Sequence, residues 1–217
     1  MRYRAICFDF DYTLGDSTDS IVAGFQHGLT TLGWPAPARE TVRKTVGYLL
    51  EDAYTLLTGD DNEEHRAAFR PLFLEVAMER QRKETKLFPG AKELLHGLKE
   101  RGIKLGIVST KRSDTLEIIL ENHGVLKDLE FVIGSDRVTK HKPDPEGLNV
   151  AAGLLGGEKG EILFCGDTVL DAGAAKNAGV DFAAVLNGTT PAEDFADFPH
   201  VHISPDLFDL NAWLDEQ

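Results

Sequence analysis

The sequence has very few cysteines, which argues against a fold held together by disulfide bonds. Only Cys7 and Cys165 occur in 217 residues. Each lies inside an apolar run, where a thiol behaves as a small buried hydrophobe. If the two runs form neighbouring parallel strands the thiols could lie close together, but two cysteines alone do not indicate an oxidising compartment. We therefore favour two free, buried thiols over a disulfide.

Positive charge and long apolar runs are also scarce. The chain has 23 Lys and Arg residues against 36 Asp and Glu residues, a formal net charge of -13, which repels polyanions such as nucleic acid. No stretch approaches the roughly 20 apolar residues of a membrane span. Asp9 ends the N-terminal apolar stretch well short of a signal-peptide core. We expect no nucleic-acid partner, no membrane association and a cytoplasmic location.

The sequence does contain enough apolar residues for a substantial core. With 42% hydrophobic and 27% charged residues, it has the composition of an ordinary globular protein. A length of 217 residues exceeds the usual single domain but is short for two independent ones. We therefore expect one core that carries an insertion, in a chain that is a monomer or a homodimer.

Short apolar runs alternate with segments of helical spacing through most of the chain. The runs predict strands at residues 5–8, 103–108, 131–133, 162–165, 182–186 and, as an edge strand, 201–203. The helical spacing predicts helices at residues 91–101, 113–123, 146–155 and 171–178, with a last helix after Ser204-Pro205. This alternation is typical of an α/β protein with a doubly wound, Rossmann-like parallel sheet covered on both faces.

Residues 15–85 show helical patterns and no convincing strand. The first helix can begin at Ser17 or Thr18 as N-cap. A second is expected at residues 41–57, where Gly47 weakens or breaks it, and a third at residues 62–84, which Pro71 should kink or divide. We therefore expect an all-helical domain at residues 15–85, inserted into a discontinuous core at residues 1–14 and 86–217.

Four aspartates stand where predicted strands end. Asp9 and Asp11 follow the first strand, and Asp167 and Asp171 follow a later one. Two carboxylates about 4 Å apart repel by roughly 4 kcal/mol at an effective dielectric constant near 20, so a cation must offset their repulsion. Oxygen ligands without cysteine or histidine favour a hard ion, and Mg²⁺ keeps open positions for a phosphate oxygen. We expect these four residues to form a magnesium site.

A carboxylate beside a metal-held phosphoryl group suggests nucleophilic attack at phosphorus. Asp9 would then form an aspartyl-phosphate, and Asp11 would protonate the leaving oxygen and later activate water. Ser109, after the second core strand, could hydrogen-bond a phosphoryl oxygen, and Lys142 could neutralise charge in the transition state. We expect Asp9, Asp11, Ser109 and Lys142 to be catalytic.

Thr110 and Lys111 directly follow Ser109 and are candidates for binding the rest of the substrate. Lys111 could bind a substrate carboxylate. A solvated basic residue at a helix start explains it about as well.

Four segments resemble the motifs of one family, the haloacid dehalogenase-like hydrolases, and among them the phosphoglycolate phosphatase-like branch. They occur in the family's order: Asp9-Phe-Asp-Tyr-Thr-Leu14, Ile107-Val-Ser109, Lys142-Pro143 and Gly166-Asp-Thr-Val-Leu-Asp171. The resemblance implies a phosphatase that acts on a small phosphorylated metabolite. It also implies that the helical insertion is a cap of type C1, which closes over the site and selects the leaving group.

The resemblance also implies individual roles. Asp9 would be nucleophile and metal ligand, Asp11 would supply its backbone carbonyl to the metal, Asp167 would be a direct ligand, and Asp171 would act through water. Tyr12 departs from the pattern, because the family most often has glycine there. The presence of Asp11 argues against dehalogenation, since the dehalogenases lack this aspartate.

Two other functions share this constellation of residues. A phosphosugar mutase of the β-phosphoglucomutase type would return the phosphoryl group to a sugar hydroxyl instead of water. A non-catalytic sensor would bind a phosphorylated ligand without turnover. A response-regulator receiver also gathers acids and a lysine at a sheet edge, but the helical insertion and the late Gly-Asp-x-x-x-Asp pattern argue against it.

Overall fold

The computed structural model describes residues 2–156 and 158–217. The chain forms two compact units. We call the first, which consists of Met1–Gly15 and Leu87–Gln217, the core unit, and the second, Asp16–Lys86, the helical unit.

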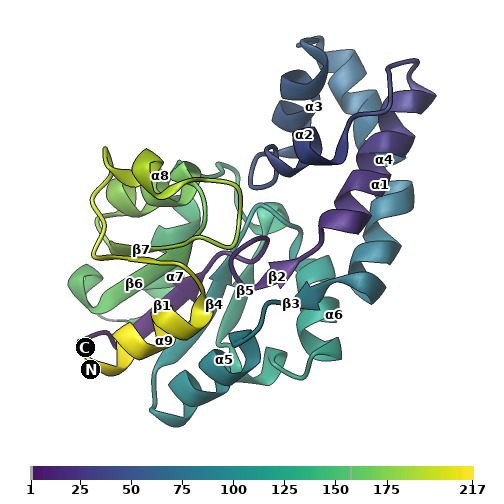
Figure 1. Ribbon diagram of the computed structural model, residues 1–217. Helices are drawn as coiled ribbons and strands as arrows, with labels where there is room; N and C mark the ends of the chain where they lie inside the picture. Colours follow the sequence, from purple (N-terminus) through teal and green to yellow (C-terminus); the bar gives the residue numbers. More distant parts are fainter. Residues whose placement is uncertain (1, 157) are drawn as a thin grey trace. The chain divides into compact units, whose positions relative to one another are not determined.

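The core unit is built on a six-stranded parallel sheet with the strand order β5-β4-β1-β6-β7-β8 (Figure 1). Its strands are β1 (Ala5–Phe8), β4 (Lys104–Val108), β5 (Phe131–Ile133), β6 (Ile162–Gly166), β7 (Asp181–Val185) and β8 (His202–Ser204). The chain places β4 and β5 on one side of β1 and then crosses to place β6, β7 and β8 on the other. In such sheets ligands bind outside the carboxyl ends of the strands, where the order reverses.

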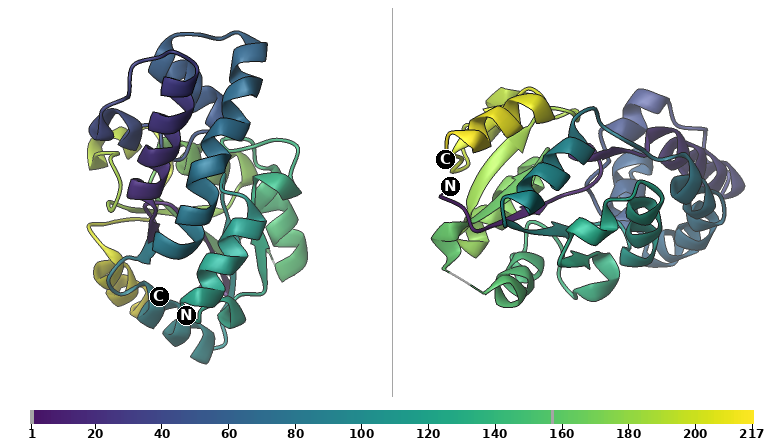
Figure 2. Two further views of the ribbon diagram at one scale, coloured as in Figure 1. Left: turned by 90° about the vertical axis from the view of Figure 1, so that its right-hand side faces the viewer. Right: turned by 90° about the horizontal axis from the view of Figure 1, so that it is seen from below.

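Helices cover both faces of this sheet, as expected from a doubly wound α/β fold. One apolar cluster joins one face to α5 (Ala91–Glu100), α6 (Ser113–Asn122) and α9 (Leu207–Asp215). A second cluster joins the other face to α7 (Glu146–Leu155) and α8 (Val169–Ala178). Figures 1 and 2 show α5 and α9 side by side. The ends of the chain also meet, where the Arg2 amide donates to the Gln217 carbonyl at 2.8 Å.

The two cysteines lie on adjacent strands but on opposite faces of the sheet. Cys7 is paired with Phe164, and Phe8 is paired with Cys165. Because successive side chains of a strand point to opposite faces, this offset of one residue places Cys7 in one apolar cluster and Cys165 in the other. Both thiols are free and buried, as the sequence predicts.

The helical unit has its own apolar interior. Its helices are α1 (Thr18–Thr31), α2 (Arg39–Arg43), α3 (Leu50–Thr58) and α4 (Glu63–Glu84). The ring of Phe25 on α1 lies 5.3 Å from that of Phe69 and 5.1 Å from that of Phe73, both on α4. The close approach requires glycine on α1, because a Cβ at Gly28 would lie 2.6 Å from the Phe69 ring.

Three details of the helical unit decide between the alternatives that the sequence leaves open. The segment expected as one helix at residues 41–57 is broken into α2 and α3, and Gly47 between them has a left-handed φ of 99°. In contrast, α4 continues through Pro71 as one helix of 22 residues, so division at this proline is wrong. Pro71 is exposed, while Phe69 and Phe73 on either side are buried and hold the helix in place.

The N-cap of α1 differs from the expectation. Ser17 stands at the N-cap position but makes no capping hydrogen bond with its side chain. Its hydroxyl instead lies 2.9 Å from that of Thr85, and the carboxylate of Asp16 accepts from the Thr18 amide at 2.9 Å. The carboxylate one residue earlier therefore satisfies the first free amide of the helix.

Several short elements were not predicted. Two-residue strands β2 (Gly15–Asp16) and β3 (Lys86–Leu87) form a separate two-stranded sheet. The short 3₁₀ helices are η1 (Leu126–Asp128), η2 (Ser135–Arg137), η3 (Lys159–Glu161) and η4 (Ala192–Phe195). Neither the two-residue strands nor the 3₁₀ helices contain an apolar run or a helical period that would reveal them. Within the described residues, none of the helices has both the length and the apolarity that crossing a membrane requires.

Candidate active site

The loop that follows β1 is a tight turn carrying the first two aspartates. The carbonyl of Phe10 accepts hydrogen bonds from the amides of Thr13, Leu14 and Gly15. Tyr12 lies within this turn at a φ of 60°, the left-handed region that side chains other than glycine rarely occupy. Its side chain is 3% exposed. The turn therefore holds Tyr12 in a left-handed backbone conformation with its side chain buried.

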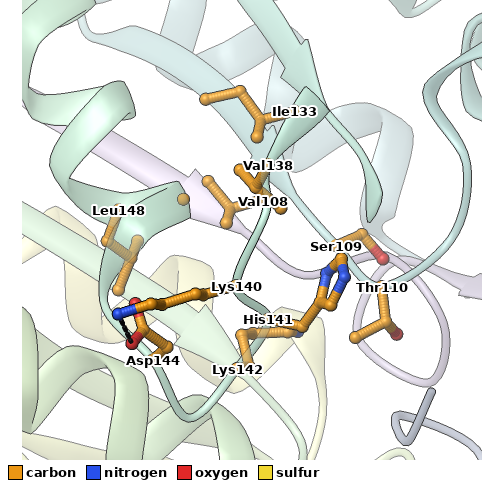
Figure 3. Close-up of a pocket in the computed structure, with 11 residues that line it drawn as sticks. Val108, Ser109, Thr110, Ile133, Val138, Lys140, His141, Lys142, Asp144 and Leu148 are labelled. Atoms are coloured by element: carbon orange, nitrogen blue, oxygen red, sulfur yellow. Dashed lines mark ion pairs between the residues drawn. The ribbon is translucent and has the colours of Figure 1, made fainter. Parts of the chain in front are cut away.

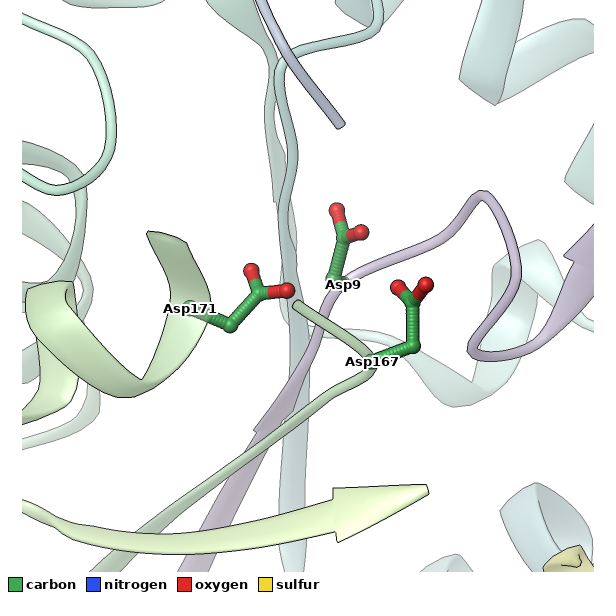
Figure 4. Close-up of side chains that lie close together, drawn as sticks. All are labelled: Asp9, Asp167 and Asp171. Atoms are coloured by element: carbon green, nitrogen blue, oxygen red, sulfur yellow. The ribbon is translucent and has the colours of Figure 1, made fainter. Parts of the chain in front are cut away.

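Three carboxylates meet at the carboxyl ends of β1 and β6. Asp9 directly follows β1, Asp167 follows β6, and Asp171 lies in the first turn of α8 (Figure 4). One oxygen of each lies within 4.8 Å of the others. All three side chains are buried, with exposures of 1%, 2% and 0%. The sheet order thus brings Asp9 together with residues that follow it by 158 and 162 positions in the chain.

Lys142 is the cation that the structure places against this cluster. Its ammonium lies 3.0 Å from Asp9 Oδ1 and 2.5 Å from Asp171 Oδ1, and it lies 5.7 Å from the centre of the Phe164 ring. Asp171 is held from its other side, because its Oδ2 accepts from the Thr168 amide at 3.0 Å and from the Thr168 hydroxyl at 2.6 Å. Thr168 in turn caps α8. Asp171 therefore orients both Lys142 and the start of this helix.

The electrostatics of the cluster show an excess of negative charge. Burial raises the pKa of Asp9 to about 6, although Lys142 acts in the opposite direction. Burial, followed by the charges of Asp171 and Asp9, raises the pKa of Asp167 well above its ordinary range. Burial works against the charge of Lys142, but Asp171 and Asp9 raise its pKa above the ordinary value. One ammonium does not balance three buried carboxylates, so a divalent cation fits this donor set, and oxygen-only ligands favour a hard ion.

Asp11 lies outside this cluster. Its Oδ2 is 2.9 Å from the ammonium of Lys111, and both side chains are largely buried. Its Oδ1 is buried with no hydrogen-bond partner among the described residues. The carboxylates of Asp9, Asp167 and Asp171 thus form the compact group, and the sequence did not reveal the pairing of Asp11 with Lys111.

Ser109 and its neighbours follow β4 at the same edge of the sheet. A hydrogen bond from Ser109 lowers the pKa of Asp9, and the Ser109 hydroxyl oxygen accepts from the Lys111 amide at 3.3 Å. Ser109, Thr110 and Lys142 line a small cavity of about 10 Å³ (Figure 3). The residues expected to bind or transform the substrate here therefore lie at one edge of the sheet: Ser109, Thr110, Lys111 and Lys142.

Two acidic residues near Lys142 have structural partners. Asp136 accepts from the amide of Ser113 at 2.6 Å and from its hydroxyl at 2.8 Å, so it holds the start of α6. Asp144 accepts from the Glu146 amide at 3.0 Å at the start of α7. Both residues therefore stabilise turns and helix starts.

Sequence reasoning missed two further contributors to the site. Thr168 could have been found, because Thr-x-x-Asp before a helix is a capping-box pattern. Asn187, whose amide donates to the Thr13 carbonyl at 3.1 Å, lies in a loop after β7 that gives no such signal.

Known proteins resemble this chain along most of its length. The model of the haloacid dehalogenase-like hydrolase family matches residues 6–185. A phosphoglycolate phosphatase of Vibrio parahaemolyticus is 33% identical over 81% of this chain and 80% of its own. A pyrophosphatase PpaX of Listeria monocytogenes is 31% identical over 100% of this chain and 98% of its own. A crystal structure from Bacteroides fragilis, assigned to the haloacid dehalogenase-like hydrolases, has 36% identity and a TM-score of 0.91 over 96% of this chain and 99% of its own.

Proposed function

The chain belongs to the haloacid dehalogenase-like hydrolases, as a phosphatase of that family, and we propose that it hydrolyses a small phosphorylated metabolite with Mg²⁺, through an aspartyl-phosphate on Asp9. The observation that supports this most is the buried group of Asp9, Asp167 and Asp171 with Lys142 against two of its members. Burying three carboxylates together destabilises the folded protein. A bound cation would offset this repulsion and hold a phosphoryl group beside Asp9.

Asp9 and Asp167, together with the backbone carbonyl of Asp11, would hold the metal directly, and Asp171 would act on it through water. When bound, Mg²⁺ offsets the charge of the carboxylates and polarises the phosphoryl group toward attack. Lys142 keeps Asp9 in place through its 3.0 Å contact and adds positive charge where the phosphoryl oxygens gather. Ser109 donates a hydrogen bond to one of those oxygens.

The chemical steps use Asp9 and Asp11. An oxygen of Asp9 forms a bond to phosphorus while the bond from phosphorus to the leaving oxygen breaks, and Asp11 gives its proton to that oxygen. Water then loses a proton to Asp11 and bonds to phosphorus, and the bond to Asp9 breaks. Phosphate leaves, and both aspartates return to their starting states.

Thr110 and Lys111 complete the proposed site as substrate-binding residues. Lys111 pairs with Asp11 in the structure, so on substrate binding its ammonium must move from Asp11 to an anionic group of the substrate. That exchange would leave Asp11 free to face the leaving oxygen. The proposed substrate is phosphoglycolate-like or a sugar phosphate. We also propose that the helical unit is a type C1 cap and that the protein is a cytoplasmic monomer or homodimer.

The test is phosphate release from a panel of phosphoglycolate, hexose phosphates, pyrophosphate and p-nitrophenyl phosphate, in Mg²⁺ and in EDTA. The matched control is Asp9→Asn, which keeps the size of the side chain. Phosphate release by the wild type in Mg²⁺ but not in EDTA, and no release by Asp9→Asn, supports the proposal. An isomerised hexose phosphate would instead indicate a mutase, and binding without turnover of any compound would indicate a sensor.

A further inference from the structure

A two-residue corner after β7, Asn187-Gly188, contacts the site from a part of the chain outside the four motifs. The side-chain amide of Asn187 donates to the carbonyl of Thr13, in the loop that carries Asp11, at 3.1 Å. A Cβ added to Gly188 would lie 2.2 Å from Asp167 Oδ2 and 3.2 Å from the Cβ of Tyr12. The corner therefore touches both the turn after β1 and a carboxylate of the buried cluster.

Position 188 requires glycine because there is no room for a side chain, not because of its backbone conformation. Gly188 is not among the glycines with a left-handed φ, so alanine could adopt its backbone conformation. The atom that a methyl group would strike is the end of the Asp167 side chain. On the opposite side, Asp167 Oδ1 accepts from the Thr13 hydroxyl at 3.3 Å. The carboxylate is thus enclosed between Thr13 and Gly188.

We propose that Asn187-Gly188 is a positioning element for the cation site, in which Gly188 sets the orientation of the Asp167 carboxylate and Asn187 holds Thr13 against its other oxygen. The inference rests on the proposed function, because it takes Asp167 as a metal ligand. A ligand carboxylate must keep its orientation closely for the metal to bind well, and loss of outer contacts typically costs 10–100-fold in metal affinity.

Gly188→Ala should therefore weaken Mg²⁺ binding about tenfold or more without unfolding the protein. The carboxylate can turn away from the new methyl group, so the fold needs no large shift, but the turned carboxylate no longer faces Asp9 and Asp171. Asn187→Ala should weaken binding in the same direction and by less, since it acts through Thr13. The matched control is Gly153→Ala in α7, where a Cβ would meet no atom within 4 Å.

The affinity of the metal-free protein for Mg²⁺ is measured by calorimetric titration, and its affinity for Mn²⁺ by electron paramagnetic resonance. Thermal unfolding in EDTA measures the stability of each variant without metal. We expect the control to bind as the wild type does, and Gly188→Ala to bind more weakly while it unfolds at a similar temperature in EDTA. Equal affinity in Gly188→Ala and the wild type would overturn this inference and leave the proposed function standing. Absence of binding by the wild type would overturn both. If Gly188→Ala unfolded early, Asn187→Ala would decide, and unchanged affinity there would overturn the inference.

Discussion

Replacing Asp167 by asparagine should stabilise the metal-free protein and abolish its stabilisation by Mg²⁺. The ligand oxygens of Asp9, Asp167 and Asp171 lie within 4.8 Å of one another, and unit charges at that separation repel by about 3.5 kcal/mol at an effective dielectric constant of 20. Charged Asp167 is repelled by two carboxylates and attracted by Lys142. Two repulsions and one attraction, each of about this size, leave roughly 3 kcal/mol of net repulsion on a fully ionised Asp167. Asp167→Asn removes this repulsion.

Protonation makes this gain depend on pH. Burial and the two neighbouring carboxylates raise the pKa of Asp167 well above its ordinary range in the folded protein. When the pKa of a carboxyl group is higher in the folded than in the unfolded state, the protein becomes less stable as the pH rises from the unfolded-state pKa to the folded-state pKa. In EDTA the advantage of Asp167→Asn should thus be small at acidic pH and should grow toward alkaline pH.

The assay is urea unfolding of both proteins in EDTA and in saturating Mg²⁺, at neutral and alkaline pH. A ligand at 100 times its dissociation constant stabilises the native state by about 2.7 kcal/mol. The wild type should gain this amount and Asp167→Asn almost nothing, so Mg²⁺ should remove most of the difference between the two midpoints. Asp197→Asn, at an exposed position, controls for the change of net charge. The reasoning is refuted if Asp167→Asn is less stable than the wild type in alkaline EDTA and gains as much from Mg²⁺.

Two further substitutions separate the remaining roles. Asp11→Asn should slow turnover by about 10²–10⁴-fold, because it removes the proton donor. Calorimetry should show unchanged Mg²⁺ affinity. A large loss of affinity would place the Asp11 carboxylate on the metal. Lys142→Met should destabilise the metal-free protein by about 3–5 kcal/mol, because Asp9 and Asp171 lose their buried partner. Urea unfolding should show a smaller loss in Mg²⁺ than in EDTA, and an equal loss would contradict the sharing of charge between lysine and metal.

The sequence predicted the fold well because the parallel sheet is made of short apolar runs separated by periodic helices. α7 begins and ends at the predicted residues, 146 and 155, and β8 lies at the edge of the sheet. Predictions failed where one side chain has several potential partners. Ser17 could cap α1, but its hydroxyl bonds to Thr85, which is 68 residues away.

The sequence predicted the approach of Asp9, Asp167 and Asp171, but not the pairing of Asp11 with Lys111. Parallel strands end at one edge, so aspartates after β1 and β6 must approach each other. Which side chains pair with one another at this edge depends on tertiary distances of a few ångströms. Lys111 was expected to face substrate or solvent, yet its ammonium lies 2.9 Å from Asp11. The close approach of Gly188 to Asp167 has no local signal at all, since it depends on how β6 and β7 are aligned.

The most direct measurement is the identity of the residue that carries phosphate during turnover. The protein, mixed with Mg²⁺ and the best substrate of the panel, is quenched in acid and reduced with borohydride, which converts an aspartyl-phosphate to homoserine. Peptide mass spectrometry should find homoserine at position 9 only when substrate is present, and none in Asp9→Asn. Homoserine at another aspartate, or at no position while phosphate is released, would contradict the account.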